Sequence, residues 1–292
     1  MINTTINNMN QIRKCLVGVV QMCSTHNKKQ NMEFILQNLK QAHEKQAKIC
    51  FLPEAFAMIS RSFAETFENA EYVDGEMINC LRDHAKKYNL WLSLGGFQER
   101  LKENDKKMGN THIIIDNLGN IVQTYKKLHL FDIKIDTKNT ISESSGYVFG
   151  DQIPNVVDSP AGRLGLSICY DLRFPELFRI LAVQQNAEIL LVPSAFFKKT
   201  GQAHWHTLLK ARAIENQCFV IAAAQAGQHN DKRESFGHSL VIDPWGEVLL
   251  DMGPEKLGID FVEIDLEKID TIRKGLPAIN HIRNDIYKLS KI

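Results

Sequence analysis

The stretch Gly165–Glu176, with the sequence GLSICYDLRFPE, gives the sharpest prediction of local structure in this chain. Apolar and small residues at positions 163–168 predict a buried strand. A helix should begin soon afterwards, because Pro175 suits the first helical position and an acid follows in the first turn. Cys169 therefore lies between a strand and a helix, where helix N–H groups favour a reactive thiolate. The alternative is an inert cysteine, buried as a small apolar residue.

Strand and helix patterns alternate on both sides of this stretch, which predicts an α/β fold. Further apolar runs predict strands at residues 14–21, 49–52, 90–94, 188–192, 219–223 and 259–264. Periodicity and good helix formers predict helices at residues 31–46, 75–88, 174–185, 203–216 and 266–274. Hairpins are expected at residues 113–122 and 240–249, each with Asp opening a tight turn and Gly three residues later. Together these patterns predict a mixed sheet system covered by helices.

The composition is that of an ordinary globular protein of 292 residues, 44% of them hydrophobic and 24% charged. No linker-like segment divides the chain, so a single domain is expected. The formal net charge of +1 and the lack of a long basic run give no support for a nucleic-acid partner. No apolar stretch approaches the length of a bilayer span, so no membrane partner is predicted.

Six cysteines are scattered through the chain without a Cys-x-x-Cys pair, which favours a reducing, cytoplasmic location. Residues 1–12 are rich in Asn and have no apolar signal core. They also lack Arg before Arg13, which argues against a transit peptide. A ragged terminus is therefore expected.

Two ionisable residues follow predicted strands in the same way as Cys169. Glu54 comes shortly after the strand at 49–52, and Lys127 follows the strand at 121–125. An acid, a base and a thiol at strand ends can converge on one rim of a sheet, where α/β proteins usually place their sites. Taken separately, each charged residue is more often a solvated surface group.

Three segments together resemble the signature segments of the nitrilase superfamily of carbon–nitrogen hydrolases. They are FLPEAF at 51–56, YKKLHLFD at 125–132 and GLSICYDLRFPE at 165–176, in that family's order of Glu, Lys and Cys. The resemblance extends over residues 14–266, which are expected to form the hydrolase domain. Residues 1–13 and 267–292 are then terminal extensions, the second packing on the domain or at an oligomer interface. The resemblance implies a four-layer α-β-β-α sandwich that assembles into a homodimer or a larger homo-oligomer.

The resemblance also implies a role for each residue of the trio. Cys169 attacks an amide carbonyl and forms a thioester, while Glu54 moves protons as general base and acid. Lys127 and the backbone N–H of Tyr170 stabilise the oxyanion. This chemistry requires no cofactor, and none is predicted.

A second glutamate supports the site in this family, and Glu143 matches it. The alternative is a loop glutamate in solvent, because residues 136–150 are polar and lack periodicity. Related proteins usually have Pro-Gly where Asp136 and Thr137 stand in this chain. The path of this loop therefore stays open.

Four further segments resemble the deaminated glutathione amidase branch of the family. They are VPSAF at 192–196, TGQAHWH at 200–206, RAIENQ at 212–217 and SFGHS at 235–239. Members of that branch act in metabolite repair: they hydrolyse glutathione whose amino group has been replaced by a keto group, giving 2-oxoglutarate and cysteinylglycine. The alternative enzyme is an ω-amidase acting on 2-oxoglutaramate or 2-oxosuccinamate. The alternative from another class is an inactive scaffold protein with the same fold.

A dicarboxylic substrate of this kind needs cationic or hydroxylic partners. Arg173 is the best candidate for a carboxylate clamp, although an ion pair with Asp171 or Glu176 explains it equally well. The remaining predicted substrate contacts are Tyr170, Phe196 and Thr200. Lys232 and Arg233 can meet the glycine carboxylate, but loop cations are more often solvated.

The sequence His204-Trp205-His206 raises the question of a metal site. In a helix this spacing puts the two rings about 200° apart, so shared ligation is not expected. No cluster of thiols or carboxylates accompanies them in the sequence, so no metal is predicted. His204 and Trp205 are instead expected to pack at the helix start, behind the pocket.

Overall fold

The computed structural model describes residues 13–102, 104–134 and 140–289, and two six-stranded sheets dominate it. The first sheet consists, in spatial order, of β16 (Gly258–Asp265), β1 (Lys14–Gln21), β2 (Ile49–Leu52), β3 (Trp91–Leu101), β4 (Asn104–Ile115) and β5 (Ile121–Lys126). The second consists of β15 (Val248–Asp251), β14 (Leu240–Ile242), β11 (Phe219–Ala222), β10 (Ile189–Leu191), β9 (Gly162–Leu166) and β8 (Val157–Ser159). Both sheets are mixed, because the central strands pair in parallel and the hairpins pair antiparallel.

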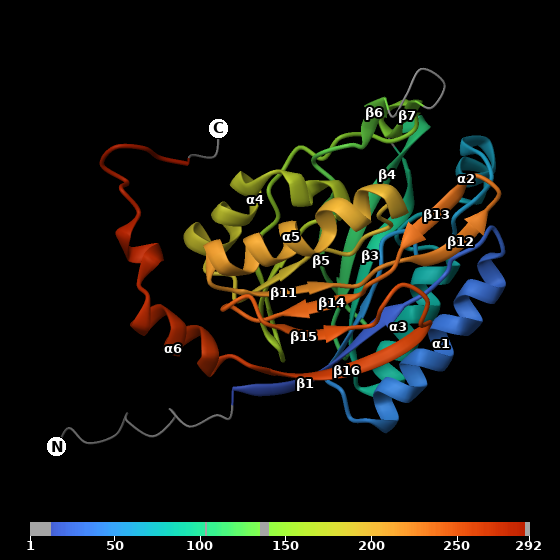
Figure 1. Ribbon diagram of the computed structural model, residues 1–292. Helices are drawn as coiled ribbons and strands as arrows, with labels where there is room; N and C mark the ends of the chain where they lie inside the picture. The colour runs from blue at the N-terminus through green and yellow to red at the C-terminus, as the bar shows by residue number, and fades with distance from the viewer. Residues whose placement is uncertain (1–12, 103, 135–139, 290–292) are drawn as a thin grey trace.

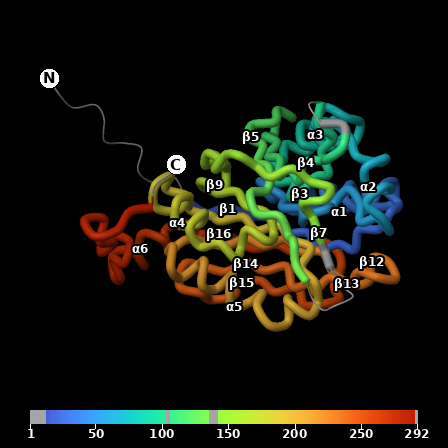
Figure 2. The backbone as a smooth tube through the Cα atoms, turned by 90° about the horizontal axis from the view of Figure 1, so that it is seen from above, coloured from blue at the N-terminus to red at the C-terminus, as the bar shows by residue number. Residues whose placement is uncertain are grey.

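Helices cover the outer side of each sheet (Figure 1). The first sheet is covered by α1 (Lys28–Glu44) and α3 (Glu76–Tyr88). The second is covered by α4 (Pro175–Arg179), its π-helical continuation η3 (Ile180–Gln184) and α5 (Lys198–Asn216). Seen from above in Figure 2, α3 and α5 lie on opposite sides with the strands between them. The four-layer α-β-β-α sandwich implied by the family resemblance is confirmed.

Shorter elements connect these layers or extend beyond them. They are α2 (Phe63–Asn69), β6 (Asp132–Lys134), β7 (Thr140–Ser142), η1 (Glu143–Ser145), η2 (Cys169–Arg173), β12 (Ala226–Asn230), β13 (Arg233–Phe236), α6 (Glu267–Gly275) and η4 (Ala278–His281). Strand β9 ends at Leu166 and η2 begins at Cys169. The predicted position of this cysteine between a strand and a helix is therefore confirmed.

Apolar side chains fill three interfaces between the four layers. Val19 of β1 and Leu166 of β9 are buried between the two sheets. Val20, the neighbour of Val19, packs on the other face of the same sheet with Leu39 of α1. Trp205 of α5 is buried against the outer face of the second sheet. Because the central strands are covered on both faces, their sequences are continuous apolar runs rather than alternating patterns.

Helix α5 begins at Lys198 rather than at Ala203, where the sequence pattern predicted its start. Gly201 lies within the additional first turn, although glycine weakens a helix. In the structure, a Cβ atom at Gly201 would lie 2.4 Å from side-chain atoms of Phe236. This glycine therefore allows the first turn of α5 to pack closely on β13, a contact that local propensity does not reveal.

The segment after β16 folds back onto the second sheet and its helices. Ile269 of α6 is buried, and Arg273 donates to the carbonyl of Gln217 at 3.2 Å. The Gln217 side chain in turn donates to the carbonyl of Leu276 at 2.7 Å. Across the described ranges, no helix is both long and apolar enough to cross a membrane.

We expect Ile221→Ala to lower the free energy of unfolding by about 2–5 kcal/mol, because truncation leaves a cavity between the sheets. Ile221 of β11 is 1% exposed and belongs to the inter-sheet core. The matched control is Leu118→Ala, since Leu118 is 65% exposed; its effect should stay within about 0.5 kcal/mol. Urea unfolding followed by circular dichroism measures both variants. Similar losses in the two would contradict the described core.

Candidate active site

A buried ammonium group lies between two carboxylates at one end of the sheets. Lys127, directly after β5, donates to Glu54 Oε1 at 2.9 Å and to Glu143 Oε2 at 3.0 Å. Glu54 follows β2, and Glu143 begins η1. The Lys127 side chain is only 2% exposed, so the charge is removed from water. A buried charge of this kind requires paired counter-charges, and the two carboxylates supply them.

Asn110 of β4 completes this charged group. Its side-chain amide donates to Glu54 Oε1 at 2.9 Å and to Glu143 Oε1 at 3.0 Å. Its backbone carbonyl accepts from the N–H of Lys127 at 2.9 Å. The sequence analysis missed this residue. The available signal was the run Asn110–His112, three polar residues directly before the apolar residues Ile113–Ile115 of the same strand.

The backbone around Glu54 is held in an uncommon conformation. Ala55 has φ +57°, a left-handed value that is rare for residues other than glycine, Asn or Asp. Its N–H donates to the carbonyl of Gly96 at 2.9 Å. A Cβ atom on Gly96 would lie 2.6 Å from Glu54 Cγ. The second carboxylate oxygen, Oε2, accepts from the N–H of Ala195 at 2.9 Å, so both oxygens are fixed in direction.

Cys169 has the same left-handed conformation, with φ +48°, at the sharp turn between β9 and η2. Its N–H donates to the carbonyl of Pro193 at 3.0 Å. Such conformations persist only where the surroundings enforce them, and they are concentrated at functional sites. The turn therefore presents the thiol at the end of the second sheet.

Asp171 is the group that holds this turn, and it is completely buried. One of its oxygens accepts from the N–H of Ile168 at 2.9 Å and from the Tyr125 hydroxyl at 2.7 Å. The other accepts from the backbone N–H of His129 at 3.1 Å and from its ring Nδ1 at 2.7 Å. Tyr125 and His129 flank the segment that carries Lys127. This carboxylate therefore connects the turn at Cys169 to the segment that carries the ammonium group of Lys127.

A cavity of about 730 Å³ opens over these groups. Glu54, Lys127, Glu143 and Cys169 all contribute to its wall. Aromatic side chains form another part of the lining: Phe131, Tyr170, Phe196 and Phe197. The lining also contains three cationic side chains, which are those of Arg61, Lys232 and Arg233. Such a volume holds a small organic molecule.

Residues 16–274 match the family model described as carbon-nitrogen hydrolase. The chain belongs to this family. It is 49% identical to the deaminated glutathione amidase of Dictyostelium discoideum, covering 96% of this chain and 97% of the relative. It is 45% identical to the deaminated glutathione amidase of Bos taurus, covering 93% of this chain and 83% of that protein.

Solved structures of the superfamily share the fold. The crystal structure of the Caenorhabditis elegans NitFhit protein superposes with a TM-score of 0.89 at 43% identity. That match covers 94% of this chain and 66% of the longer fusion protein. Saccharomyces cerevisiae Nit3, a member of branch 10 of the nitrilase superfamily, superposes with a TM-score of 0.81 at 29% identity, covering 92% of this chain and 97% of Nit3.

The protonation states in this hydrolase follow from burial and from the neighbouring charges. Burial alone raises the pKa of Glu54. The charge and hydrogen bond of Lys127, with hydrogen bonds from Cys169 and Asn110, act in the opposite direction, and the pKa lies below its usual value. Burial alone lowers the pKa of Lys127, and the carboxylates of Glu143 and Glu54 hold it well above its usual value. At neutral pH the site therefore contains a carboxylate base beside an ammonium ion.

The pKa of the Cys169 thiol is raised, whereas a position at a helix N-terminus is expected to lower it. Burial raises its pKa, and the nearby Glu54 carboxylate raises it further. Lys127 acts in the opposite direction but does not compensate. The expectation of a thiolate stabilised by helix N–H groups was therefore wrong for the resting site. A neutral thiol faces a carboxylate that can accept its proton.

The predicted substrate contacts divide into two groups. Tyr170, Phe196 and Thr200 all line the cavity. Arg173 is not among the residues that line it. The guanidinium group of Arg173 lies over the rings of Tyr170 and Phe196, and it contacts His204 Nδ1 at 3.4 Å.

The ion pair expected for Arg173 is not found within the described ranges, and its role as a carboxylate clamp stays a prediction. Asp171, one of the expected ion-pair partners, is occupied by the donors described above. Glu176, the other, shows no ion pair with Arg173 within the described ranges. Stacking on the aromatic wall fixes Arg173 instead, which is a tertiary contact that sequence spacing does not encode.

Glu143 lies in the site, as the family resemblance implies, rather than in solvent. Its backbone and side chain both contact Phe131, whose N–H donates to Glu143 Oε2 at 2.6 Å. The positions Asp136 and Thr137, where the chain departs from the family pattern, lie outside the described residues, as do residues 1–12.

The two histidines of the His204-Trp205-His206 segment diverge, as their spacing predicts. His204 is exposed and contacts Arg173, so it does not pack behind the pocket as expected. Trp205 does pack there, with its ring 4.9 Å from that of Phe196. His206 contacts Asp251 at 3.1 Å.

We expect the Cys169 thiolate to appear only at a pH above the usual thiol value of about 8.5, because burial and Glu54 raise its pKa. In Glu54→Gln the negative charge is absent, so the thiolate should appear at a lower pH than in the wild type. The difference in ultraviolet thiolate absorbance between each protein and its Cys169→Ala counterpart isolates this group. A wild-type midpoint below the usual value, or one unaffected by Glu54→Gln, would contradict the assignment.

Proposed function

We propose that this hydrolase is an amidase that cleaves deaminated glutathione to 2-oxoglutarate and cysteinylglycine. The observation that carries the proposal is the convergence of Glu54, Lys127 and Cys169 on one cavity. Support for the substrate comes from the relatives named deaminated glutathione amidase, which are 44–49% identical over nearly the whole chain.

The first half of the reaction forms a thioester. Glu54 accepts the thiol proton of Cys169, and the sulfur attacks the amide carbon, which becomes tetrahedral with a negatively charged oxygen. When the carbon–nitrogen bond breaks, Glu54 returns the proton to the nitrogen. Cysteinylglycine leaves as a free amine, and the 2-oxoglutaryl group stays on the sulfur.

The second half hydrolyses the thioester. A water molecule attacks the thioester carbon while Glu54 accepts its proton, and the carbon–sulfur bond then breaks. The proton returns to the sulfur, so that 2-oxoglutarate leaves and the neutral thiol is restored. A single carboxylate with a fixed direction serves both halves, which agrees with hydrogen bonds to both of its oxygens.

Lys127 and the N–H of Tyr170 stabilise the oxyanion in both halves. Lys127 and Cys169 line the same cavity. Tyr170 is the second residue of η2, and the first N–H groups of a helix have no intrahelical acceptor. Loss of one oxyanion donor typically reduces the rate by about a hundredfold or more. Glu143 accepts hydrogen bonds from Lys127 and so keeps its ammonium group in place. Glu54 is then the carboxylate that transfers protons.

The cations of the cavity suit the second carboxylate of this substrate. Arg233 stacks on Phe197 with its guanidinium carbon 4.9 Å from the ring centre, and it donates to the carbonyl of Ala195 at 3.3 Å. Its Nε is buried without a partner among the described residues. An unsatisfied buried donor in a cavity wall suits a ligand oxygen. We assign Arg233, with Lys232 beside it, to the glycine carboxylate.

Phe196 and Thr200 flank the opposite, 2-oxoglutaryl part of the substrate in this proposal. The Thr200 hydroxyl donates to the carbonyl of Phe197 at 3.2 Å and can also accept a hydrogen bond. Arg173 reaches that part of the substrate only if its side chain leaves the aromatic wall. Its role as a carboxylate clamp therefore requires a change of rotamer upon binding.

We also propose a cytoplasmic homodimer or larger homo-oligomer. All six cysteines are free, which agrees with a reducing compartment. Ile214 on α5, Trp245 in the β14–β15 turn and Leu276 after α6 are each more than half exposed. Apolar side chains grouped on one surface favour association. We therefore propose that residues 267–289 lie at or near the interface.

We expect the wild type to release 2-oxoglutarate from deaminated glutathione with a higher kcat/KM than from 2-oxoglutaramate. Cys169→Ala should lower the rate by more than about a thousandfold, because no thioester can form. A coupled glutamate dehydrogenase assay measures 2-oxoglutarate from both substrates. Equal or reversed preference would favour the ω-amidase, and no release from either substrate would favour the inactive scaffold.

Arg233→Met should raise KM for deaminated glutathione by about ten- to a hundredfold, the size of a lost charge-assisted hydrogen bond. The smaller 2-oxoglutaramate lacks the cysteinylglycine half, so its KM should change less than about twofold. The matched control is Lys210→Met, which removes an exposed cation on α5 that does not line the cavity. Equal increases for both substrates would show that Arg233 shapes the cavity rather than binding the glycine carboxylate.

A further inference from the structure

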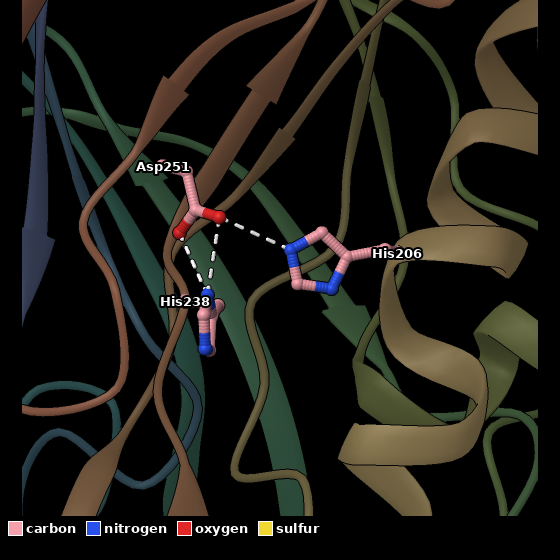
Figure 3. A group of neighbouring side chains, drawn as sticks. All are labelled: His206, His238 and Asp251. Atoms are coloured by element: carbon pink, nitrogen blue, oxygen red, sulfur yellow. Dashed lines mark hydrogen bonds and ion pairs between the residues drawn. The ribbon is translucent and has the colours of Figure 1, made fainter.

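Three side chains with metal-binding chemistry converge on the outer side of the second sheet (Figure 3). They come from different elements: His206 from α5, His238 from the connection between β13 and β14, and Asp251 from the end of β15. His206 Nε2 lies 3.1 Å from Asp251 Oδ2, and His238 Nδ1 lies 2.8 Å from Asp251 Oδ1. One potential ligand atom from each residue lies within 4.8 Å of the other two.

The ligand set and spacing suit a tetrahedral ion such as Zn²⁺. Imidazole nitrogen and carboxylate oxygen bind Zn²⁺ at about 2.0–2.2 Å, which places neighbouring ligand atoms roughly 3.3 Å apart. The two contacts to Asp251 are shorter than this by a few tenths of an ångström. Small rotations of the side chains would therefore open the space for an ion, and water would take the fourth position.

Second contacts already orient two of the three ligands, Asp251 and His238. Asp251 Oδ1 accepts from the N–H of Gly253 at 2.8 Å. The backbone of His238 is fixed at both ends, since its N–H donates to the Gly253 carbonyl at 2.8 Å and its carbonyl accepts from Trp205 Nε1 at 2.8 Å. The ring of Phe236 stacks on that of His238 at 4.5 Å. In metal sites, hydrogen bonds to the ligand residues fix the orientation of the ligands in this way.

Besides these small rotations, metal binding requires a change of tautomer in the two rings. Without an ion, each ring nitrogen that faces Asp251 carries the proton of a hydrogen bond. When that proton occupies the opposite nitrogen of the neutral ring, the lone pair is free for the metal. One carboxylate and two neutral imidazoles then give a Zn²⁺ site with a net charge of +1. Asp251 is exposed, so an ion can enter from solvent.

We propose that His206, His238 and Asp251 form a structural site for Zn²⁺ or a similar divalent transition metal. The ion would tie α5 to the β14–β15 hairpin. It would also stiffen the cavity wall, because the first turn of α5 carries Thr200 and packs on Phe236. This site is separate from the cysteine chemistry, and it does not depend on the proposed substrate.

Competition with a chromophoric zinc chelator on the full-length, metal-stripped protein tests the proposal. We expect one Zn²⁺ per chain, with affinity lowered at least about tenfold in His206→Ala and in His238→Asn. Asn is chosen because it tolerates the left-handed backbone of His238, which has φ +55°. His204→Ala, two residues away on the same helix, is the matched control and should bind like the wild type. Circular dichroism confirms that each variant is folded.

Co²⁺ distinguishes this site from binding at cysteine. Nitrogen and oxygen ligands give visible Co²⁺ bands without the intense thiolate charge-transfer band, and the spectrum should persist in Cys169→Ala. Zn²⁺ should also raise the melting temperature of the wild type and of His204→Ala, but not that of His206→Ala. No Zn²⁺ binding by the wild type, equal affinity in all variants, or a thiolate band would overturn the proposal.

Discussion

The ammonium group of Lys127, held out of water between Glu54 and Glu143, is the constraint on which the rest of the site depends. Two carboxylates around one cation leave a net negative charge in a buried place, which is tolerated only because hydrogen bonds satisfy the remaining lone pairs. Asn110 and the N–H groups of Ala195 and Phe131 supply those bonds. Charges that are far apart in sequence therefore fix the mutual positions of β2, β4, β5 and η1.

The same charges set the protonation states in the site. A carboxylate held ionised by Lys127 lies beside a thiol whose pKa is raised, which is the arrangement that the proposed mechanism uses. The left-handed turn at Cys169 brings the thiol to this carboxylate, and Asp171 holds the turn. The ion network around Lys127 and the left-handed turn at Cys169 therefore lie at the same cavity.

The cavity wall depends on contacts between elements rather than on any one segment. Gly201 lets the first turn of α5 approach β13, and this brings Thr200 into the wall. Arg233, on β13, lines the same cavity, whereas Arg173 stacks on the rings of Tyr170 and Phe196 and does not itself line the cavity. The sequence suggests a carboxylate contact for both arginines. Their surroundings differ because helix packing and aromatic stacking place the two side chains differently.

The sequence by itself determined the local architecture and singled out Glu54, Lys127 and Cys169 as candidate site residues. Two-sided apolar strands, tight turns opened by Asp, and the strand–turn–helix at Cys169 are encoded within about ten residues each, the range over which periodicity and turn chemistry act. Only the tertiary structure decided the role of Asn110, the position of Arg173, the protonation of the thiol and the meeting of His206 with His238 and Asp251. These features depend on burial and on contacts between distant segments, and one-dimensional patterns do not record such contacts.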